Sequence, residues 1–391
     1  MVLNDVCEFI IDCPHTTAVD EGEGYPLIRT PNIGKGKLLL NGVHRVSEKV
    51  YLQRNARGTP RDGDLIFARE APAGNVAVIR KGEKVCLGQR TVLLRPNTQK
   101  VHPVYLAYYL LSPEQQHKLV GSANGSTVAH VNLPTIRNLR IDIPDLHTQT
   151  QIANILAAYD DLTDSNLKKI SVLEQIAENL YKEWFVRFRF PGHEHIEFIN
   201  GIPKGWRVAK LRDVATEVGK SIKKENLEGY DYYLPIDCLP NKSMHLNIAD
   251  NISNAESSLH SFKKGDILFG AMRPYFHKVL RAPVDGVTRK TCFVINAKQK
   301  DYAEWLYLLL YQKSTVDFAT TVSVGSTMPY VRWQDFSRMN IVLPDEKTAT
   351  EFSKRVVDVL NRINLFYFEN DTLIKQRDLL LPRLMSGKLE V

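Results

Sequence analysis

The chain contains a tandem internal repeat. Gly63-Asp64-Leu65-Ile66-Phe67 returns as Gly265-Asp266-Ile267-Leu268-Phe269, and Asp142-Ile143-Pro144-Asp145 returns as Val342-Leu343-Pro344-Asp345. Gly125-Ser126-Thr127 likewise returns as Gly325-Ser326-Thr327. The matches are shifted by 200 residues, or by 202 at the first of them. A repeat of this size predicts two similar modules in one chain, and so two similar surfaces held apart by whatever connects them.

Each copy has the pattern of a mixed α+β module. Short β-branched and aromatic runs such as 75–79 and 291–295 are bounded by Gly and Pro, and they predict strands with tight turns. A helix is expected after them, over 103–119 in the first copy and over 302–315 in the second. Both helices carry aromatic stripes, which we interpret as core: Tyr105, Tyr108, Tyr109, Trp305, Tyr307 and Tyr311. Pro144 and Pro344 mark the module ends.

Each copy is followed by a long segment in which seam positions alternate by four and three residues. That spacing is typical of helices that wrap around a partner. The packing positions expected in the two helices are Ile152, Leu156, Tyr159, Asn166, Ile170, Leu173, Leu180, Trp184, Phe352, Val356, Val359, Ile363, Phe366, Asn370, Leu373, Leu380 and Leu384. The polar Asn166 and Asn370 fall at different steps of the seam, where they disfavour wrong registers.

Two arrangements of these helices are open from the pattern alone. The helices can pair antiparallel with each other, which we favour, or each can pack on its own module. The span from Ile152 to Trp184 is roughly 50 Å at about 1.5 Å per residue. Major-groove faces on one side of a duplex repeat every ~34 Å. Such a helix pair is long enough to act as a ruler between two DNA-facing modules.

Composition limits the class of protein. A chain of 391 residues with 43% hydrophobic and 24% charged residues is expected to fold into two or three soluble domains. No run approaches the ~20 apolar residues of a membrane helix, and no signal-peptide pattern precedes the first copy. The five cysteines are scattered without a C-x-x-C pair, so neither a disulfide framework nor a zinc site is expected. A reducing cytoplasm is the simplest location.

The positive charge is concentrated in the two copies. Residues 1–145 hold 18 Lys and Arg against 14 Asp and Glu, and residues 201–345 hold 20 against 15. The helical stretches 146–200 and 346–391 have net charges of −3 and +1. This distribution favours two DNA-facing modules on a nearly neutral spacer. Charge alone fits a slightly basic protein without a nucleic-acid role equally well.

Motifs for catalysis are missing. Gly34-Lys35-Gly36-Lys37 has neither the spacing nor the hydroxyl residue of a phosphate loop, and no G-x-G-x-x-G turn occurs. The Asn/Asp-Pro-Pro-aromatic tetrapeptide of adenine methyltransferases is also absent, and 273–276 is not a version of it. His193 and His195 are expected to be solvated loop residues, and Asp62 and Asp64 to belong to a structural turn. No catalytic residue and no metal ligand is predicted.

The repeated segments resemble the specificity subunit of Type I restriction–modification enzymes. The similarity rests on 202–206 (Ile-Pro-Lys-Gly-Trp) leading to 211–214, then on Gly-Asp-Ile-Leu, Gly-Ser-Thr and Leu-Pro followed by a heptad helix. The ending 379–389 resembles the C-terminal signature of the family, and 146–155 resembles the start of its central helix. The resemblance covers essentially the whole chain. One departure is that the first copy lacks the Pro-x-Gly-Trp opening of the second, which we interpret as a naturally short form.

The resemblance implies an α+β fold with two similar target-recognition domains, related by pseudo-twofold symmetry and separated by two long antiparallel, coiled-coil-like helices. We expect the first domain at 1–145, the central helix and linker at 146–200, the second domain at 201–345 and the C-terminal helix at 346–391. It further implies a non-catalytic subunit that binds double-stranded DNA, two adenine methyltransferase (modification) subunits and ATP-dependent restriction subunits. S-adenosylmethionine, Mg²⁺ and ATP would belong to those partners, so no cofactor and no membrane are expected for this chain.

Candidate DNA contacts come from the loops beside the repeated motifs. Arg pairs with guanine and Asn or Gln with adenine, whereas Lys, Ser and Thr mainly contact phosphates. The candidates in the first copy are Arg69, Asn75, Gln89, Arg90, Ser126, Thr127, His130 and Asn132. The candidates in the second copy are Arg273, Tyr275, His277, Lys278, Arg289, Lys290, Ser326, Thr327, Tyr330 and Arg332. The repeated Asp64 and Asp266 are expected to build turns instead.

The loops differ between the copies, since 68–72 (Ala-Arg-Glu-Ala-Pro) corresponds to 270–274 (Gly-Ala-Met-Arg-Pro). Modules with different contact residues should read different half-sites, which predicts a bipartite, asymmetric target. Two other hypotheses remain at this stage. A self-sufficient DNA-modifying or DNA-cleaving enzyme would bind its cofactor as an isolated chain. A duplicated protein-interaction scaffold would show no salt-dependent binding to duplex DNA.

Overall fold

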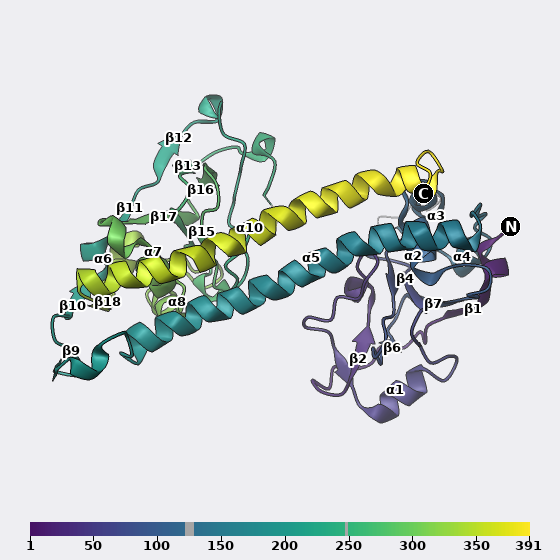
Figure 1. Ribbon diagram of the computed structural model, residues 1–391, viewed down its shortest axis with the longest axis horizontal. Helices are drawn as coiled ribbons and strands as arrows, with labels where there is room; N and C mark the ends of the chain where they lie inside the picture. The colour runs from purple at the N-terminus through teal and green to yellow at the C-terminus, as the bar shows by residue number, and fades with distance from the viewer. Residues whose placement is uncertain (122–128, 247–248) are drawn as a thin grey trace. The chain divides into compact units, whose positions relative to one another are not determined.

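The computed structural model describes residues 1–121, 129–246 and 249–391. They form two compact units, of which unit 1 comprises Met1–Leu162 with Thr372–Val391 and unit 2 comprises Thr163–Asp371. Each unit contains one copy of the repeat together with parts of the two long helices, α5 (Leu146–Tyr181) and α10 (Glu346–Met385). Figure 1 shows the C-terminal end of α10 lying beside the N-terminal module within unit 1.

The main sheet of unit 1 has four strands in the order β1-β7-β4-β5, all paired antiparallel. These strands are β1 (Cys7–Asp12), β4 (Leu65–Ala68), β5 (Val76–Val78) and β7 (Thr91–Pro96). Every residue of β4 is buried because Leu65 and Phe67 face one core cluster while Ile66 and Ala68 face another. A smaller sheet joins β3 (Arg45–Val46), β2 (Tyr25–Ile28) and β6 (Cys86–Leu87).

Unit 2 repeats this arrangement with a main sheet in the order β11-β17-β14-β15. Its strands are β11 (Ala215–Glu217), β14 (Ile267–Gly270), β15 (Val279–Arg281) and β17 (Cys292–Ala297). Two further sheets pair β12 (Lys220–Ile222), β13 (Leu259–Phe262) and β16 (Gly286–Arg289), and β10 (Arg207–Lys210) with β18 (Asn340–Leu343). Because β4–β7 and β14–β17 hold the repeated Gly-Asp segment at equivalent places, the duplication predicted from the sequence is confirmed at the level of topology.

The helix expected in each module is broken into two. In unit 1, α2 (Pro103–Leu111) ends at Ser112, and Pro113 starts α3 (Pro113–Val120), since proline restricts the preceding residue to extended backbone. In unit 2, α7 (Ala303–Leu310) and α8 (Lys313–Thr321) are separated at Tyr311 and Gln312. The expected single helices were therefore wrong, whereas the aromatic stripes are buried as predicted. The remaining short helices are α1 (Glu48–Arg54), α4 (Leu133–Arg137), α6 (Leu211–Val214) and α9 (Trp333–Phe336).

The long helices pair antiparallel within each unit and also pack on the module of that unit. In unit 1, Leu384 of α10 shares a core cluster with Ile152 and Leu156 of α5 and with the module. In unit 2, Trp184, which follows α5, lies 5.5 Å from Phe352 of α10 between ring centroids. All the heptad positions named above are buried or half-buried. The two packing arrangements left open by the sequence are thus combined.

A polar pair interrupts the apolar seam in unit 2. Asn166 Nδ2 donates to Asn370 Oδ1 at 3.0 Å, and Asn370 Nδ2 donates to the backbone oxygen of Thr163 at 3.3 Å. The two asparagines are 0% and 6% exposed. A bonded pair in a buried seam is formed in one register only, because sliding one helix along the other would leave both amides unsatisfied.

Replacing Asn166 by leucine is expected to lower the free energy of unfolding of unit 2 by about 1–3 kcal/mol, because the Asn370 amide then loses its partner in the seam. Unfolding in urea followed by tryptophan fluorescence measures this change. The matched control is the double replacement Asn166→Leu/Asn370→Leu, which removes both polar groups and should recover most of the loss. A double variant no more stable than the single one would contradict the pairing.

No helix among the described residues is long and apolar enough to cross a membrane.

Candidate nucleic-acid interface

Three segments meet at the same place in each module, and backbone hydrogen bonds join them. In unit 1 the N–H of Arg69 donates to the carbonyl of Arg90 at 2.9 Å, and the N–H of Val131 donates to the carbonyl of Arg69 at 3.0 Å. In unit 2 the N–H of Ala271 donates to the carbonyl of Thr291 at 2.8 Å, and the N–H of Val331 to that of Ala271 at 2.9 Å. We call this arrangement the three-segment frame. It brings together the loops in which the contact residues were predicted.

The frame of unit 1 holds a network of charged side chains. Arg69 pairs with Asp12 at 2.7 Å and lies 3.0 Å from Nε2 of His130 through its Nη2. Glu70 contacts Nδ1 of His130 at 2.5 Å and Nη1 of Arg90 at 2.9 Å. The Arg69 side chain is 11% exposed, whereas that of Arg90 is 61% exposed. Arg69 therefore braces the frame from within, and Arg90 presents its guanidinium to solvent.

The other predicted contacts of unit 1 differ in how much of their side chain is available. Asn75 is committed inside the module, since its Nδ2 donates to the carbonyl of Ile33 at 2.8 Å. Gln89 is half-buried and its Nε2 donates to the carbonyl of His15 at 3.2 Å. Asn132 is exposed just before α4. Ser126 and Thr127 lie outside the described residues.

Unit 2 fills the same frame with different side chains. Ala271 takes the place that Arg69 has in unit 1, and Arg273 follows two residues later with φ +50°. The N–H of Arg273 donates to the carbonyl of Pro329 at 2.7 Å, and its Nη2 donates to that of Thr327 at 3.3 Å. Tyr275 is 51% exposed. This loop therefore presents an exposed aromatic ring in addition to an arginine.

The remaining candidates of unit 2 fall into two groups. His277 and Lys278 are used internally, because the His277 ring is 2.8 Å from the carbonyl of Tyr311 and Lys278 Nζ donates to that of Ile236 at 2.7 Å. Burial lowers the pKa of His277. The second group lies at the end of β16 and on the frame loops, exposed or half-buried: Arg289, Lys290, Ser326, Thr327, Tyr330 and Arg332. In this group the Tyr330 hydroxyl donates to the carbonyl of Lys290, and Arg332 pairs with Asp335.

The repeated Gly-Asp turns are structural, as expected. Asp64 is 1% exposed, accepts the backbone N–H of Arg61 at 2.9 Å and pairs with Arg95 at 2.7 Å. Asp266 is 5% exposed and accepts the N–H of Lys263 at 2.7 Å and Nδ2 of Asn296 at 2.9 Å. The preceding glycines have φ of +80° and +94°, which other residues adopt with strain.

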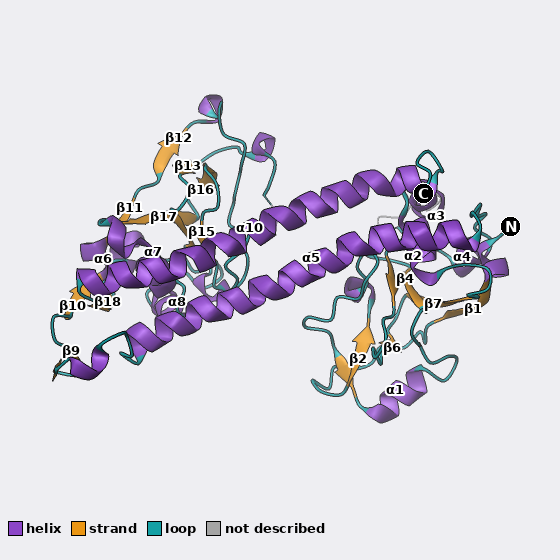
Figure 2. Ribbon diagram, viewed as in Figure 1, coloured by secondary structure: helices purple, strands orange, loops and turns teal. Residues whose placement is uncertain are grey.

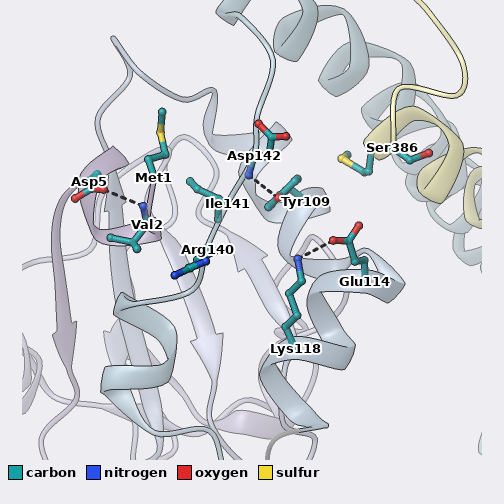
Figure 3. A pocket seen from close by; sticks show the side chains of 11 residues that line it. Met1, Val2, Asp5, Tyr109, Glu114, Lys118, Arg140, Ile141, Asp142 and Ser386 are labelled. Atoms are coloured by element: carbon teal, nitrogen blue, oxygen red, sulfur yellow. Dashed lines mark hydrogen bonds and ion pairs between the residues drawn. The ribbon is translucent and has the colours of Figure 1, made fainter.

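A polar hollow lies in unit 1 beside α2 and α3. It measures about 780 Å³ and is lined by parts of the N-terminal segment, of α2 and α3 and of the chain after α10 (Figure 3). Its polar lining groups bond to one another, as when Lys118 pairs with Glu114 at 2.6 Å and the N–H of Asp142 donates to the hydroxyl of Tyr109 at 3.0 Å. Across the described residues no group of three or more His, Cys, Asp or Glu could hold a metal ion.

Comparison with known proteins gives the family. The family model described as the Type I restriction modification DNA specificity domain matches residues 1–175 and again residues 203–375. The chain belongs to the Type I restriction–modification specificity subunit family. The resemblance inferred from the repeated motifs is thereby confirmed, and the two matches correspond to the two copies of the repeat.

Two specificity subunits are similar along most of their length. The chain is 25% identical over 368 residues to the Type I restriction enzyme MjaIX specificity subunit of Methanocaldococcus jannaschii, covering 90% of this chain and 83% of that protein. It is 23% identical to the HindI specificity subunit of Haemophilus influenzae, covering 93% and 94%. The crystal structure of the specificity subunit from M. genitalium aligns over 98% of this chain and 95% of that one, with a TM-score of 0.58 and 14% identity. The expected fold class, two α+β modules with two long antiparallel helices, is confirmed.

Two residues of the specificity-subunit frame escaped the sequence-based predictions. Asp12 and Glu70 pair with the arginines of unit 1, although residue type alone does not predict carboxylates at a surface that meets phosphates. The only signal in the sequence is that Glu70 interrupts an otherwise uncharged or basic loop and corresponds to Met272 in the second copy. Because methionine cannot pair with arginine or histidine, the ion pairs made by Glu70 occur in unit 1 and have no counterpart at Met272 in unit 2.

Proposed function

We propose that this specificity subunit is non-catalytic and reads a bipartite, asymmetric duplex site, with one half-site for each three-segment frame. The observation that carries the proposal is that one backbone frame is built twice and filled differently. Unit 1 offers Arg90 beside Glu70, and unit 2 offers Tyr275 with Arg289 and Lys290. Because base identity is read by side chains and not by the backbone frame, the two half-sites should differ in sequence.

The DNA contacts are proposed to come from the exposed side chains of the frames. Arg90 and Asn132 in unit 1, and Arg289, Ser326 and Thr327 in unit 2, have side chains open to solvent. Arg69, Asn75, His277 and Lys278 are proposed to support these loops from below, since their polar atoms bind protein groups. The two target-recognition domains, proposed at 1–145 and 201–345, would be spaced by the helix pair.

The long helices are proposed to bind the partner subunits. Large apolar side chains stay exposed on the helices, namely Leu162 and Leu379 in unit 1 and Val172, Ile176 and Leu365 in unit 2. Leu365 and Leu379 are 63% and 71% exposed, which favours a protein partner over bulk water. Two adenine methyltransferase subunits and the restriction subunits are the proposed partners. S-adenosylmethionine, Mg²⁺ and ATP would be bound by those subunits.

Strand-specific mapping of N6-methyladenine in host DNA, with and without this gene, tests the proposal. Deletion is expected to abolish methylation at one split motif whose halves differ and are separated by an unread spacer. Complementation with the intact gene is the control and should restore the same motif.

A palindromic motif, or one continuous motif, would contradict the proposal that the two frames bind two different half-sites. An unchanged methylation pattern would lead to a second measurement, salt-dependent duplex binding by the purified chain. Absence of such binding would reject the DNA-recognition role.

A further inference from the structure

A second polar hollow lies next to Arg90 in unit 1. It measures about 210 Å³, and its lining includes Arg29, Arg54, Gln89 and Arg90. The first two were not among the residues predicted from the sequence to contact DNA. Three arginines thus line one small cavity beside the frame.

The charge of Arg54 is buried without a carboxylate partner among the described residues. The residue is 6% exposed. Its Nε donates to the carbonyl of Leu87 at 2.6 Å and its Nη2 to that of Thr16 at 2.9 Å. Carbonyl oxygens satisfy the hydrogen bonds but leave the positive charge uncompensated. A buried cation without a counter-charge is costly, so the cavity has a strong preference for an anion.

Arg29 is held at the same cavity with an unused donor. Its Nε is buried and has no hydrogen-bond partner among the described residues. A side chain added at Gly88 would place its Cβ 2.9 Å from Cγ of Arg29 and 2.6 Å from the carbonyl of Ile28, so the glycine allows this close approach. Asp20 is exposed and accepts the backbone N–H groups of Gly22 and Arg45, and among the described residues its carboxylate forms no ion pair with Arg29.

We infer that this cavity, formed by Arg29, Arg54 and Arg90, binds one phosphodiester of the DNA backbone next to the base pair that Arg90 contacts. The inference rests on the proposed function. Arg54 supplies a fixed charge, Arg29 adds a second positive charge at the cavity lining, and Arg90 links the phosphate site to the base-reading frame. A phosphate fits the chemistry because guanidinium groups bind its oxygens with charge-assisted hydrogen bonds.

The test uses the full chain with its modification subunits, and duplexes carrying the motif found by methylation mapping. Replacing Arg29 by glutamine should weaken binding about tenfold and reduce the slope of log K against log salt concentration by about 0.9, the value for one phosphate contact. Base preference at every position should stay unchanged. Arg61→Gln is the matched control, since it removes one positive charge from a side chain that pairs with Glu8 and does not line the cavity.

A duplex with one neutral methylphosphonate, moved stepwise along the first half-site, locates the contact. One position should weaken binding by the intact complex and have no effect on the Arg29→Gln complex. An identical salt slope and identical methylphosphonate effects in both complexes would overturn the inference. So would a rise in melting temperature with inorganic phosphate alone that Arg29→Gln abolishes without changing duplex binding, because the site would then hold a free anion. Failure of the intact complex to bind duplex DNA would instead reject the proposed function.

Discussion

Replacing Arg377 by leucine is expected to lower the free energy of unfolding of unit 1 by about 3–5 kcal/mol, the range for breaking a buried ion pair by removing one partner. Arg377 of α10 pairs with Asp160 of α5, and their side chains are 12% and 9% exposed. Asp160 also accepts the hydroxyl of Tyr108 from α2. Without Arg377, the Asp160 carboxylate would stay buried with no cation, at the point where both helices meet the module.

The two units can be followed separately in this experiment. All four tryptophans, Trp184, Trp206, Trp305 and Trp333, lie in unit 2, whereas circular dichroism reports on both units. The Arg377→Leu chain should show an early circular-dichroism transition in urea while the tryptophan transition keeps its midpoint. The double replacement Asp160→Leu/Arg377→Leu is the control and should recover much of the loss, since no charge is left buried. Coincident, unshifted transitions would show that the pair contributes little.

Replacing Arg90 by alanine is expected to relax the motif at one G·C base pair of the first half-site and to leave the second half-site intact. The guanidinium is 61% exposed, and Glu70 holds its Nη1 at 2.9 Å, so the group is oriented before DNA arrives. A bidentate Arg–guanine contact discriminates by about 1–3 kcal/mol, or roughly five- to 150-fold. Methylation mapping in a strain that carries only the variant gene measures the change base by base.

Two further variants separate reading from general weakening. Arg289→Ala removes an exposed arginine from unit 2, so any change it causes should fall in the second half-site. Glu70→Gln keeps the shape of the Arg90 support but removes its charge, and a smaller relaxation at the same base pair is expected. If Arg90→Ala lowered methylation equally at all sites without changing the motif, Arg90 would be a phosphate contact and not a base reader.

The fold was predictable as far as periodicity and repetition carry information. The repeat predicted two modules of one topology, and the heptad spacing predicted two helices that pair. Periodicity does not show that each module helix is broken into two, although Pro113 marks the break in the first copy. In the second copy no proline is present at Tyr311–Gln312, and the side chains of Gln312 and Thr315 replace helical bonds by donating to the carbonyls of Leu308 and Leu309. These local hydrogen bonds from side chains leave no periodic signal in the sequence.

The sequence predicted which loops form the candidate site, but not which of their side chains are exposed and which support the loops. Residue type favoured Arg69 and Arg90 equally as DNA contacts. In the structure Arg69 pairs with Asp12 of β1, whereas Arg90 is exposed to solvent. Asp12 is separated from Arg69 by 57 positions in the chain, so their pairing depends on the order β1-β7-β4 of the sheet. The sequence also does not indicate that Arg29 and Arg54 line one cavity, because the fold brings these two distant residues together.

Backbone hydrogen bonds join the three segments in the same way in both units, whereas the side chains that brace them differ, and this has a bearing on how such proteins diversify. Hydrogen bonds between N–H and C=O groups are indifferent to the side chains, so Ala271 and Arg69 can occupy one position of the same scaffold. Substitutions of the exposed loop residues can then change the side chains that the frame presents while its backbone hydrogen bonds are kept. Because the frame constrains few side chains, its conservation is compatible with the 23–25% identity between this chain and the two relatives named above.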